Sequence, residues 1–461
     1  MTVKALLDTA GRRTDRAFLI GVELKSRSSW DVRDSLDELA ELARTAGAQV
    51  IGEGTQRLDA PHPATYIGAG KATEFSEQCR ALAADTVLFD DELTPAQARN
   101  LEEIFGTKVL DRTGLILDIF AQRARTREGK LQVELAQLQY ILPRLTRFWT
   151  HLSRQRGSTG SIGGEGESQL ESDRRKTKER MEKLSGELVE VRRQRATQRA
   201  GRQRHQWPLA SIVGYTNAGK STLLNRLTGA TVTAEDKLFA TLDPTTRRLR
   251  LPTNQNVLLS DTVGFIRKLP HGLVESFKAT LEEVVEAELL LHVVDAGHPH
   301  AGEQIRAVNA VLEEIGAANK PTLMVFNKVD HPAAAEGASR LMPQFHHAVA
   351  VSARSGAGIP DLQAQLGVML RPVRATMRLS IPHDAAALIA RLHAVGQVLE
   401  RRYDGDRAWF RAQIPPYVAH EFAHYQVPEK AARPVGRKQR RTAPPSKKGS
   451  RNPSGEAARR R

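Results

Sequence analysis

Eight consecutive residues of this chain match the pattern of a phosphate-binding loop. They are Gly214, Tyr215, Thr216, Asn217, Ala218, Gly219, Lys220 and Ser221. In this pattern backbone N–H groups surround the phosphates, the lysine reaches the outer phosphates, and the hydroxyl binds Mg²⁺. The residue types therefore predict a nucleoside triphosphate site in which Lys220 is catalytic and Ser221 is a magnesium ligand.

A second group of residues follows the apolar run at 256–260. It consists of Asp261, Thr262, Val263 and Gly264. An aspartate at the end of a strand can hold Mg²⁺ through water, and a glycine N–H can meet the γ-phosphate because no side chain intervenes. We therefore expect this whole group to contact the nucleotide, with Gly264 acting as a catalytic group at the γ-phosphate.

Two further motifs predict that the base is guanine. They are Asn327, Lys328, Val329 and Asp330, followed by Ser352, Ala353 and Arg354. The Asp330 carboxylate can accept hydrogen bonds from guanine's ring N–H and amine, a donor pair that adenine lacks, so GTP is favoured over ATP. We expect Asn327 to join this loop to the phosphate loop, the Lys328 stem to cover the base, and the backbone amides of 352–354 to contact the guanine carbonyl oxygen.

A motif such as 327–330 is, in isolation, also typical of a helix cap or a turn. Here the motifs occur in one order, and apolar runs at 209–213, 256–260, 322–326 and 349–351 precede them. Each run predicts a strand, and residues 221–227 predict a helix after the phosphate loop. This strand–loop–helix setting is the context in which the phosphate-binding pattern is specific.

The segment between the first two motifs is expected to sense the γ-phosphate. We predict nucleotide contact from its first residues, which are Phe239, Ala240, Thr241, Leu242 and Asp243. A threonine here should supply the second protein ligand to Mg²⁺, but Thr241, Thr245 and Thr246 compete and spacing alone does not choose between them. Loss of the γ-phosphate should release this segment and the one after Gly264.

The remaining chain predicts a multidomain α/β protein. Strands expected at 17–22, 48–51, 86–90 and 108–110 alternate with helices at 30–46, 72–83 and 95–105, which favours a parallel, helix-flanked sheet. The predicted units are an N-terminal α/β domain at 1–112, a helical hairpin at 113–206, a P-loop GTPase domain at 207–371, a small α+β domain at 372–428 and a disordered basic tail at 429–461.

The sequence predicts further details of three of these units. The hairpin is expected to have a long first limb over 113–156, kinked at Pro143, a glycine-rich loop at 157–167 and a second helix at 169–203. The C-terminal unit should contain strands at 377–381 and 408–414 around a helix at 385–398. In the N-terminal domain, residues 68–71 (G-A-G-K) indicate either a second nucleotide site around Lys71 or a turn that starts a helix.

Charge is concentrated in two segments of a chain whose net charge is +15. Residues 429–461 hold 12 Lys or Arg against two acidic residues, and residues 173–204 hold 12 against five. Such segments indicate a polyanionic partner, with nucleic acid favoured, although a solvated helix face and a solubilising tail have the same composition. One cysteine, Cys79, excludes a disulfide framework, and no apolar run is long enough to predict a membrane span.

At this point the residues resemble the HflX family of GTPases, which bind the large ribosomal subunit and split ribosomes. The stretches that carry the resemblance are residues 64–71 (ATYIGAGK), 91–97 (DELTPAQ), 111–124 (DRTGLILDIFAQRA), 132–140 (QVELAQLQY), 214–221 and 239–245 (FATLDPT). The resemblance spans roughly residues 17–428. It implies Thr241 as the Mg²⁺ ligand, the large ribosomal subunit and its rRNA as partners, and an N-terminal domain and hairpin that reach toward the peptidyl-transferase region.

We further expect a monomer in the cytoplasm, with a peripheral membrane-associated fraction as an additional location. Two positions depart from related GTPases. Phe265 stands where many GTPases use a glutamine to orient the attacking water, which predicts slow intrinsic hydrolysis. Asn217 adds a potassium ion as a candidate cofactor, because an asparagine at this place in related GTPases helps to hold one. In the glycine-rich loop, Gly163 to Glu165 replace the family's usual Arg and Pro.

Other functions fit parts of the same pattern. A GTPase of ribosome assembly or RNA modification would bind a precursor subunit or tRNA without splitting ribosomes. An ATP-dependent RNA-remodelling enzyme would use Lys71 in the N-terminal domain. A GTP-gated anchor would bind ribosomes without releasing subunits.

Overall fold

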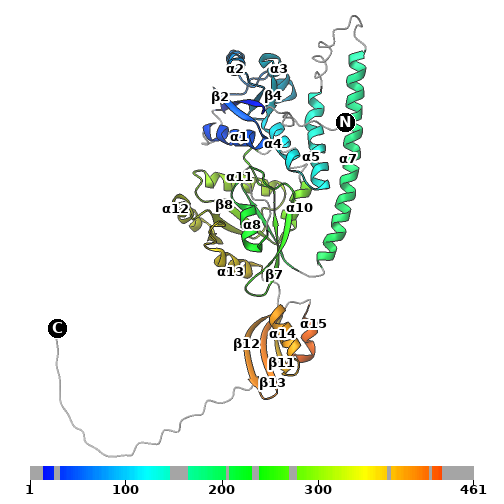
Figure 1. Ribbon diagram of the computed structural model, residues 1–461, viewed down its shortest axis with the longest axis vertical. Coiled ribbons are helices and arrows are strands. Elements are labelled where there is room, and N and C mark those ends of the chain that lie inside the picture. Colours follow the sequence, from blue (N-terminus) through cyan, green and yellow to red (C-terminus); the bar gives the residue numbers. More distant parts are fainter. Residues whose placement is uncertain are drawn as a thin grey trace, which may run out of the picture.

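The computed structural model describes residues 14–24, 32–145, 165–203, 207–230, 238–268, 278–370, 375–414 and 418–427. Figure 1 shows an α/β unit at the top, a long helix along one side, a second α/β unit in the middle and a small sheet at the bottom. This arrangement confirms the predicted multidomain α/β fold. Among the described residues, no helix is both long enough and apolar enough to cross a membrane.

The N-terminal unit is built on a parallel sheet in the strand order β2-β1-β3-β4. Its strands are β1 (Arg16–Leu24), β2 (Gln49–Leu58), β3 (Thr86–Phe89) and β4 (Lys108–Asp111), and its helices are α1 (Val32–Ala46), α2 (Ala69–Ala81), α3 (Pro95–Phe105) and α4 (Arg112–Arg123). The central strands β1 and β3 are almost wholly apolar because helices cover both faces of a parallel sheet.

The expected single limb over 113–156 is wrong within the described residues. Helix α4 ends at Arg123, and a separate helix, α5 (Arg127–Ile141), begins after Thr126. The Thr126 hydroxyl accepts a hydrogen bond from Gly129 N, so Thr126 is the N-cap of α5. Pro143 lies in the short 3-10 turn η1 (Leu142–Arg144), which directly follows α5.

Helix α7 (Glu165–Gln203) packs along α5, as Figure 1 shows. The two helices share a small apolar cluster around the buried Leu184 and Leu188. Arg180 also holds Glu134 with two hydrogen bonds of 2.8 and 2.9 Å. Residues 157–164 of the predicted loop, and the whole tail predicted at 429–461, lie outside the described residues. The loop prediction is wrong for residues 165–167, which belong to α7.

The middle unit contains a six-stranded sheet in the order β10-β9-β8-β5-β7-β6. Its strands are β5 (Leu209–Gly214), β6 (Thr245–Arg250), β7 (Asn256–Asp261), β8 (Leu289–Asp295), β9 (Thr322–Asn327) and β10 (Ala348–Ala350). Its helices are α8 (Lys220–Thr228), α10 (Lys278–Glu286), α11 (Ala301–Glu314), α12 (Pro332–Leu341), the 3-10 turn η2 (Met342–Gln344) and α13 (Ile359–Met369). All strands are parallel except β6, so the loops after β5, β7, β9 and β10 meet at one edge.

The C-terminal unit is an antiparallel sheet in the order β11-β13-β12. It consists of β11 (Ala375–Pro382), α14 (Ala386–Val395), β12 (Gln397–Asp404), β13 (Arg407–Ile414), α15 (Ala419–Phe422) and the 3-10 turn η4 (Ala423–Tyr425). The helix expected to reach residue 398 ends at Val395, and no strand was predicted from the sequence where β12 lies. Because β12 is an edge strand with mostly exposed polar residues, it lacks the apolar run that marks a buried strand.

Candidate nucleotide-binding site

The phosphate loop connects the end of β5 to the start of α8, and its backbone requires glycine at two positions. Gly214 has φ 148° and Gly219 has φ 92°, a region that favours glycine. A Cβ atom on Gly214 would lie 2.2 Å from Val293 O, and one on Gly219 would lie 2.3 Å from Asn327 Nδ2. The neighbouring strands therefore leave room only for a bare backbone.

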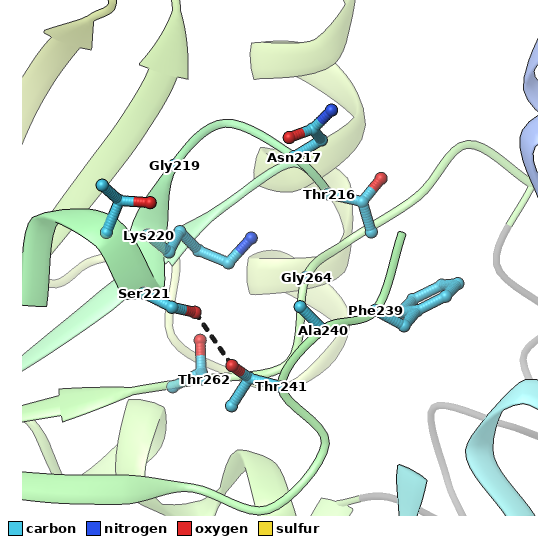
Figure 2. A pocket seen from close by; sticks show the side chains of 11 residues that line it. Thr216, Asn217, Gly219, Lys220, Ser221, Phe239, Ala240, Thr241, Thr262 and Gly264 are labelled. Atoms are coloured by element: carbon cyan, nitrogen blue, oxygen red, sulfur yellow. Dashed lines mark hydrogen bonds between the residues drawn. The ribbon is translucent and has the colours of Figure 1, made fainter. Parts of the chain in front are cut away.

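A pocket opens beside this loop (Figure 2). It is lined by Thr216, Asn217, Gly219, Lys220, Ser221, Thr222, Phe239, Ala240, Thr241, Thr262 and Gly264. All of these except Thr222 were predicted to contact the nucleotide. The phosphate-loop pattern ends at Ser221, so it gave no reason to predict a contact from Thr222 in the first turn of α8.

Lys220 is buried in this pocket, and its side chain extends toward the loop that carries Gly264 (Figure 2). Its ammonium group donates a hydrogen bond to Tyr215 O at 2.7 Å. Burial lowers the pKa of Lys220 to about 8, and the Asp261 carboxylate only partly opposes this shift. A phosphate anion next to the ammonium would raise this pKa again, because it stabilises the charged form, so the site favours an anionic ligand.

Three oxygen-bearing side chains meet below Lys220. Ser221 Oγ lies 2.8 Å from Thr241 Oγ1, and the two hydroxyls donate to Asp261 Oδ2 at 2.6 and 3.1 Å. Mg²⁺ prefers hard oxygen ligands at about 2.0–2.1 Å in octahedral geometry, which sets neighbouring ligand oxygens about 3 Å apart. The Asp261 Oδ1 atom is buried, and no described residue hydrogen-bonds to it. These groups fit a magnesium ion.

The structure distinguishes between the three threonines that the sequence left as candidates for the second Mg²⁺ ligand. Only Thr241 reaches Ser221. Thr245 begins β6 and pairs with Asp261 in the sheet, whereas the Thr246 hydroxyl lies 3.4 Å from the Glu283 carboxylate. Geometry therefore favours Thr241 over the other two as a metal ligand.

Gly264 closes the pocket opposite Lys220. A Cβ atom there would lie 2.7 Å from Thr216 Cγ2 and 3.0 Å from Lys220 Nζ, so a side chain would occupy the space beside the lysine. The backbone of Phe265 bonds to the phosphate loop through Gly214 O and Thr216 N. Its ring is 2% exposed and packs in the core, away from the pocket.

The other predicted contacts near the phosphates are not among the residues that line this pocket. They are Gly214, Tyr215, Ala218, Leu242, Asp243, Asp261 and Val263. Asp243 was expected at the nucleotide, but its carboxylate accepts hydrogen bonds from Arg125 N at 2.8 Å, from Thr126 N at 2.9 Å and from the Thr126 hydroxyl. Its partners are more than 100 positions away in the chain, so no local pattern could reveal them.

The loops predicted to bind guanine meet at the same sheet edge. Asn327 Nδ2 donates to Ala218 O at 2.8 Å, and Asn327 Oδ1 accepts from Ala353 N at 3.0 Å. Ser352 N donates to Ala357 O. Of the three amides predicted to contact guanine, those of Ser352 and Ala353 therefore already have protein acceptors.

The side chains of Lys328 and Asp330 lie at the rim of this edge. Lys328 has φ 68°, and its ammonium lies 2.7 Å from Asp295 Oδ2 at the end of β8. A hydrogen bond from Ser352 lowers the pKa of Asp330, so its carboxylate is held in the acceptor form that guanine requires. Val329 is fixed by a backbone bond to Val351.

The second candidate nucleotide site, around Lys71, has the geometry of a helix start. Gly68 is the N-cap of α2, and its N–H donates to Gln56 Oε1 at 2.9 Å. The Lys71 ammonium pairs with Glu74 at 2.7 Å and lies over the Phe75 ring. These contacts favour a turn that starts a helix.

The N-terminal unit touches the segment after Gly264, which we call the second switch segment (residues 264–268). Arg112 is 1% exposed and lies 3.0 Å from Glu38 Oε2 and 3.5 Å from Asp90 Oδ1. Lys268 joins the same cluster through Asp90 and through Asp91, the latter at 2.7 Å. The cluster thus joins residues of the N-terminal unit directly to this segment.

The phosphate loop is part of the same contact. Tyr215 Oη donates to Glu38 Oε1 at 2.7 Å and accepts from Arg267 N at 2.7 Å. Although burial raises the pKa of Asp90, Arg112 and Lys268 together hold it below its ordinary value. Burial raises the pKa of Glu38, and Arg112 opposes that shift.

The N-terminal half also touches the first switch segment (residues 239–246). The Phe239 ring meets the Phe120 ring of α4 edge-on, with centroids 4.9 Å apart. Asp243 binds the junction between α4 and α5 through Thr126. Both segments predicted to respond to the γ-phosphate therefore contact elements outside the middle unit.

Three protein-family models match the chain in sequence. They are described as "GTP-binding GTPase N-terminal" over residues 33–121, "GTP-binding GTPase Middle Region" over residues 123–202 and "50S ribosome-binding GTPase" over residues 210–328. A protein named GTPase HflX from Lacrimispora saccharolytica is 46% identical over 401 residues, which cover 87% of this chain and 94% of that protein. The chain belongs to the HflX family of GTPases. The resemblance noted in the sequence is confirmed.

A second relative agrees with this assignment. The HflX GTPase of Escherichia coli K12 is 48% identical over 371 residues, covering 80% of this chain and 87% of that protein. Among solved structures, a GTP-binding protein of Sulfolobus solfataricus in complex with GDP aligns with 77% of this chain and 98% of its own, at 24% identity and a TM-score of 0.41. As an HflX-family member, the chain is a GTPase that binds GTP.

Replacement of the Thr241 hydroxyl tests the metal geometry. We expect Thr241→Val to lower the GTP hydrolysis rate by roughly 10²-fold, because an oxygen next to the developing phosphate charge is lost. Phosphate release at several Mg²⁺ concentrations measures the effect. Thr245→Val is the matched control, since Thr245 does not reach Ser221. Equal losses in both variants would contradict the assignment of Thr241.

Proposed function

We propose that this HflX-family GTPase associates with the large ribosomal subunit and dissociates ribosomes, and that the ribosome stimulates its GTP hydrolysis. The observation that carries the proposal is the double contact between the N-terminal half and the two switch segments. The match to a family described as 50S ribosome-binding supports the partner. So does the sequence of helix α7, which is rich in Arg and Lys.

In this proposal Ser221 and Thr241 are the protein ligands of Mg²⁺, and Asp261 holds it through water. The bound ion would neutralise charge on the phosphate oxygens. Lys220 binds the outer phosphates, the Gly264 N–H faces the γ-phosphate, and Asp330 selects guanine. The amides and side chains of the phosphate loop bind the other phosphate oxygens. These contacts matter because positioning and charge stabilisation account for most of phosphoryl-transfer catalysis.

The attacking water must be oriented by a group other than Phe265, since its ring is buried in the core. We propose that intrinsic hydrolysis is slow and that ribosome binding orders the switch segments into a competent arrangement. Binding energy then splits the ribosome, and hydrolysis relaxes both segments and weakens binding. A monomer is sufficient for this cycle, and a ribosomal partner would locate the protein in the cytoplasm.

Sedimentation of empty 70S-type ribosomes tests the function. With the protein we expect subunits to separate in GTP and in a non-hydrolysable GTP analogue, but not in GDP, because binding rather than hydrolysis does the work. Intact ribosomes in all three nucleotides, together with ribosome-stimulated hydrolysis, would instead indicate an assembly factor. Trapping on intact ribosomes in GTP would indicate an anchor.

Potassium dependence follows from Asn217, which lines the pocket with φ 60°. We propose that K⁺ next to Asn217 supplies positive charge that other GTPases take from an arginine finger. Hydrolysis should then be faster in KCl than in NaCl at equal ionic strength, and Asn217→Ala should remove the difference. Equal rates in the two salts would rule the ion out.

Asp243 offers a test of coupling between the nucleotide and the ribosome contact. We expect Asp243→Ala to keep GTP affinity within about twofold, because Asp243 lies outside the pocket lining. Splitting should fall roughly tenfold or more, since hydrogen bonds to a charged group contribute about 1.5–3 kcal/mol. Nucleotide titration and ribosome sedimentation measure the two effects. Asp361→Ala, at an exposed position in the first turn of α13, is the control; unchanged splitting by Asp243→Ala would contradict the coupling.

A further inference from the structure

The C-terminal sheet has one covered face and one uncovered face. Residues of α14, α15 and the sheet form a single apolar core, which includes Leu392, Phe422 and Phe410. Along β13, residues alternate strictly between exposed and buried up to Ala412. The buried set faces the helices, so the alternate set forms the opposite face of the sheet. Figure 1 shows both helices on one side of the strands.

Trp409 lies at the centre of the uncovered face. It is on β13, the middle strand, and is directly opposite Ser380 on β11 and Arg402 on β12. Residues directly opposite one another share a face. The Trp409 side chain is 36% exposed, although burial of a tryptophan would strongly favour folding. Ser380 is 6% exposed, and the Arg407 guanidinium donates to its hydroxyl at 2.9 Å and to its carbonyl at 3.0 Å, which holds this arginine on the same face as the indole.

Arginines occupy the neighbouring positions on the same face of the sheet as Trp409. Arg378 and Arg411 are opposite each other one pair further along, and Arg407 is opposite Pro382 on the other side of Trp409. Glu400 forms an ion pair with Arg411 at 2.9 Å, and Asp404 is opposite Arg407 on the neighbouring strand. Within the described residues no ion pair holds Arg402, which is exposed next to Trp409. The face therefore combines an exposed indole with a net positive charge.

We propose that this face binds single-stranded RNA, with a base stacked on Trp409 and phosphates held by the surrounding arginines. An aromatic side chain on a central strand of an open sheet is a general means of binding unpaired bases, because every base has a flat π-face. Arginine adds charge attraction and stacking. The inference rests on the proposed ribosome association only for the source of the RNA, an unpaired segment of rRNA.

Tryptophan emission tests the stacking directly in the full chain. In one variant Trp30, Trp149 and Trp207 are replaced by Phe, which leaves Trp409 as the sole tryptophan. A matched variant keeps only Trp207, on the middle unit. Both are titrated with a ten-nucleotide uridine RNA and, separately, with inorganic polyphosphate, which has charge but no bases. GTP hydrolysis rates confirm that both variants are folded.

We expect RNA to quench Trp409 emission saturably and to leave Trp207 emission unchanged, while polyphosphate quenches neither. Trp409→Ala should weaken RNA binding about fivefold or more in anisotropy, and Trp409→Phe should restore most of it, since stacking contributes about 1–3 kcal/mol per base. RNA binding without quenching of Trp409 would overturn the proposal, because the basic segments alone would then account for it.

Ribosome sedimentation separates this inference from the proposed function. Loss of ribosome association in Trp409→Ala without any RNA quenching would identify a protein contact on this face and overturn the RNA assignment. Quenching by RNA, with ribosome association unchanged in Trp409→Ala, would support the RNA surface and overturn rRNA as its source. Ribosome splitting can fail in either case without affecting the quenching result.

Discussion

A buried arginine joins the two halves of this molecule. Arg112 has no access to solvent that could replace its partners, so Glu38 and Asp90 must stay beside it. Removal of one member of a buried ion pair typically costs about 3–5 kcal/mol, because the other charge is left uncompensated. The contact with Lys268 and Tyr215 is built on this cluster, and the position of the second switch segment depends on it.

The first switch segment is held by a different kind of contact. The Asp243 carboxylate accepts hydrogen bonds from the backbone N–H groups of Arg125 and Thr126, just before α5 begins. The Phe239 ring packs on α4. Thr241, between these two, belongs to the metal site. A short stretch of chain therefore carries the nucleotide contact and the contact to the hairpin. Movement of one cannot leave the other unchanged, which is the physical basis for coupling in the proposed cycle.

The surfaces proposed to bind RNA lie on different elements from those that form the nucleotide site. Helix α7 extends its charge along one side of the molecule, and the uncovered sheet face lies at the opposite end from the N-terminal unit (Figure 1). The middle unit lies between them and holds the GTP site. Such a distribution suits a protein that binds a large surface and releases it when one central site changes.

The sequence by itself determined the parts whose signals are local. Phosphate-loop glycines, the guanine motif and the parallel strands that precede them are contiguous patterns, because hydrogen bonding and apolar periodicity act over neighbouring residues. The break at Thr126 was also local, as a helix cap, yet apolar residues on both sides concealed it. Polar β12 had no apolar run to mark it as a strand.

Only the tertiary structure decided how these parts are used. It brought Thr241 rather than Thr245 or Thr246 to Ser221, turned Phe265 into the core and directed Asp243 toward Thr126. It also buried Arg112 between two units. The reason is physical: charges and hydroxyls find their partners through space, over separations in the chain that no spacing rule covers, once the apolar cores have fixed which surfaces meet.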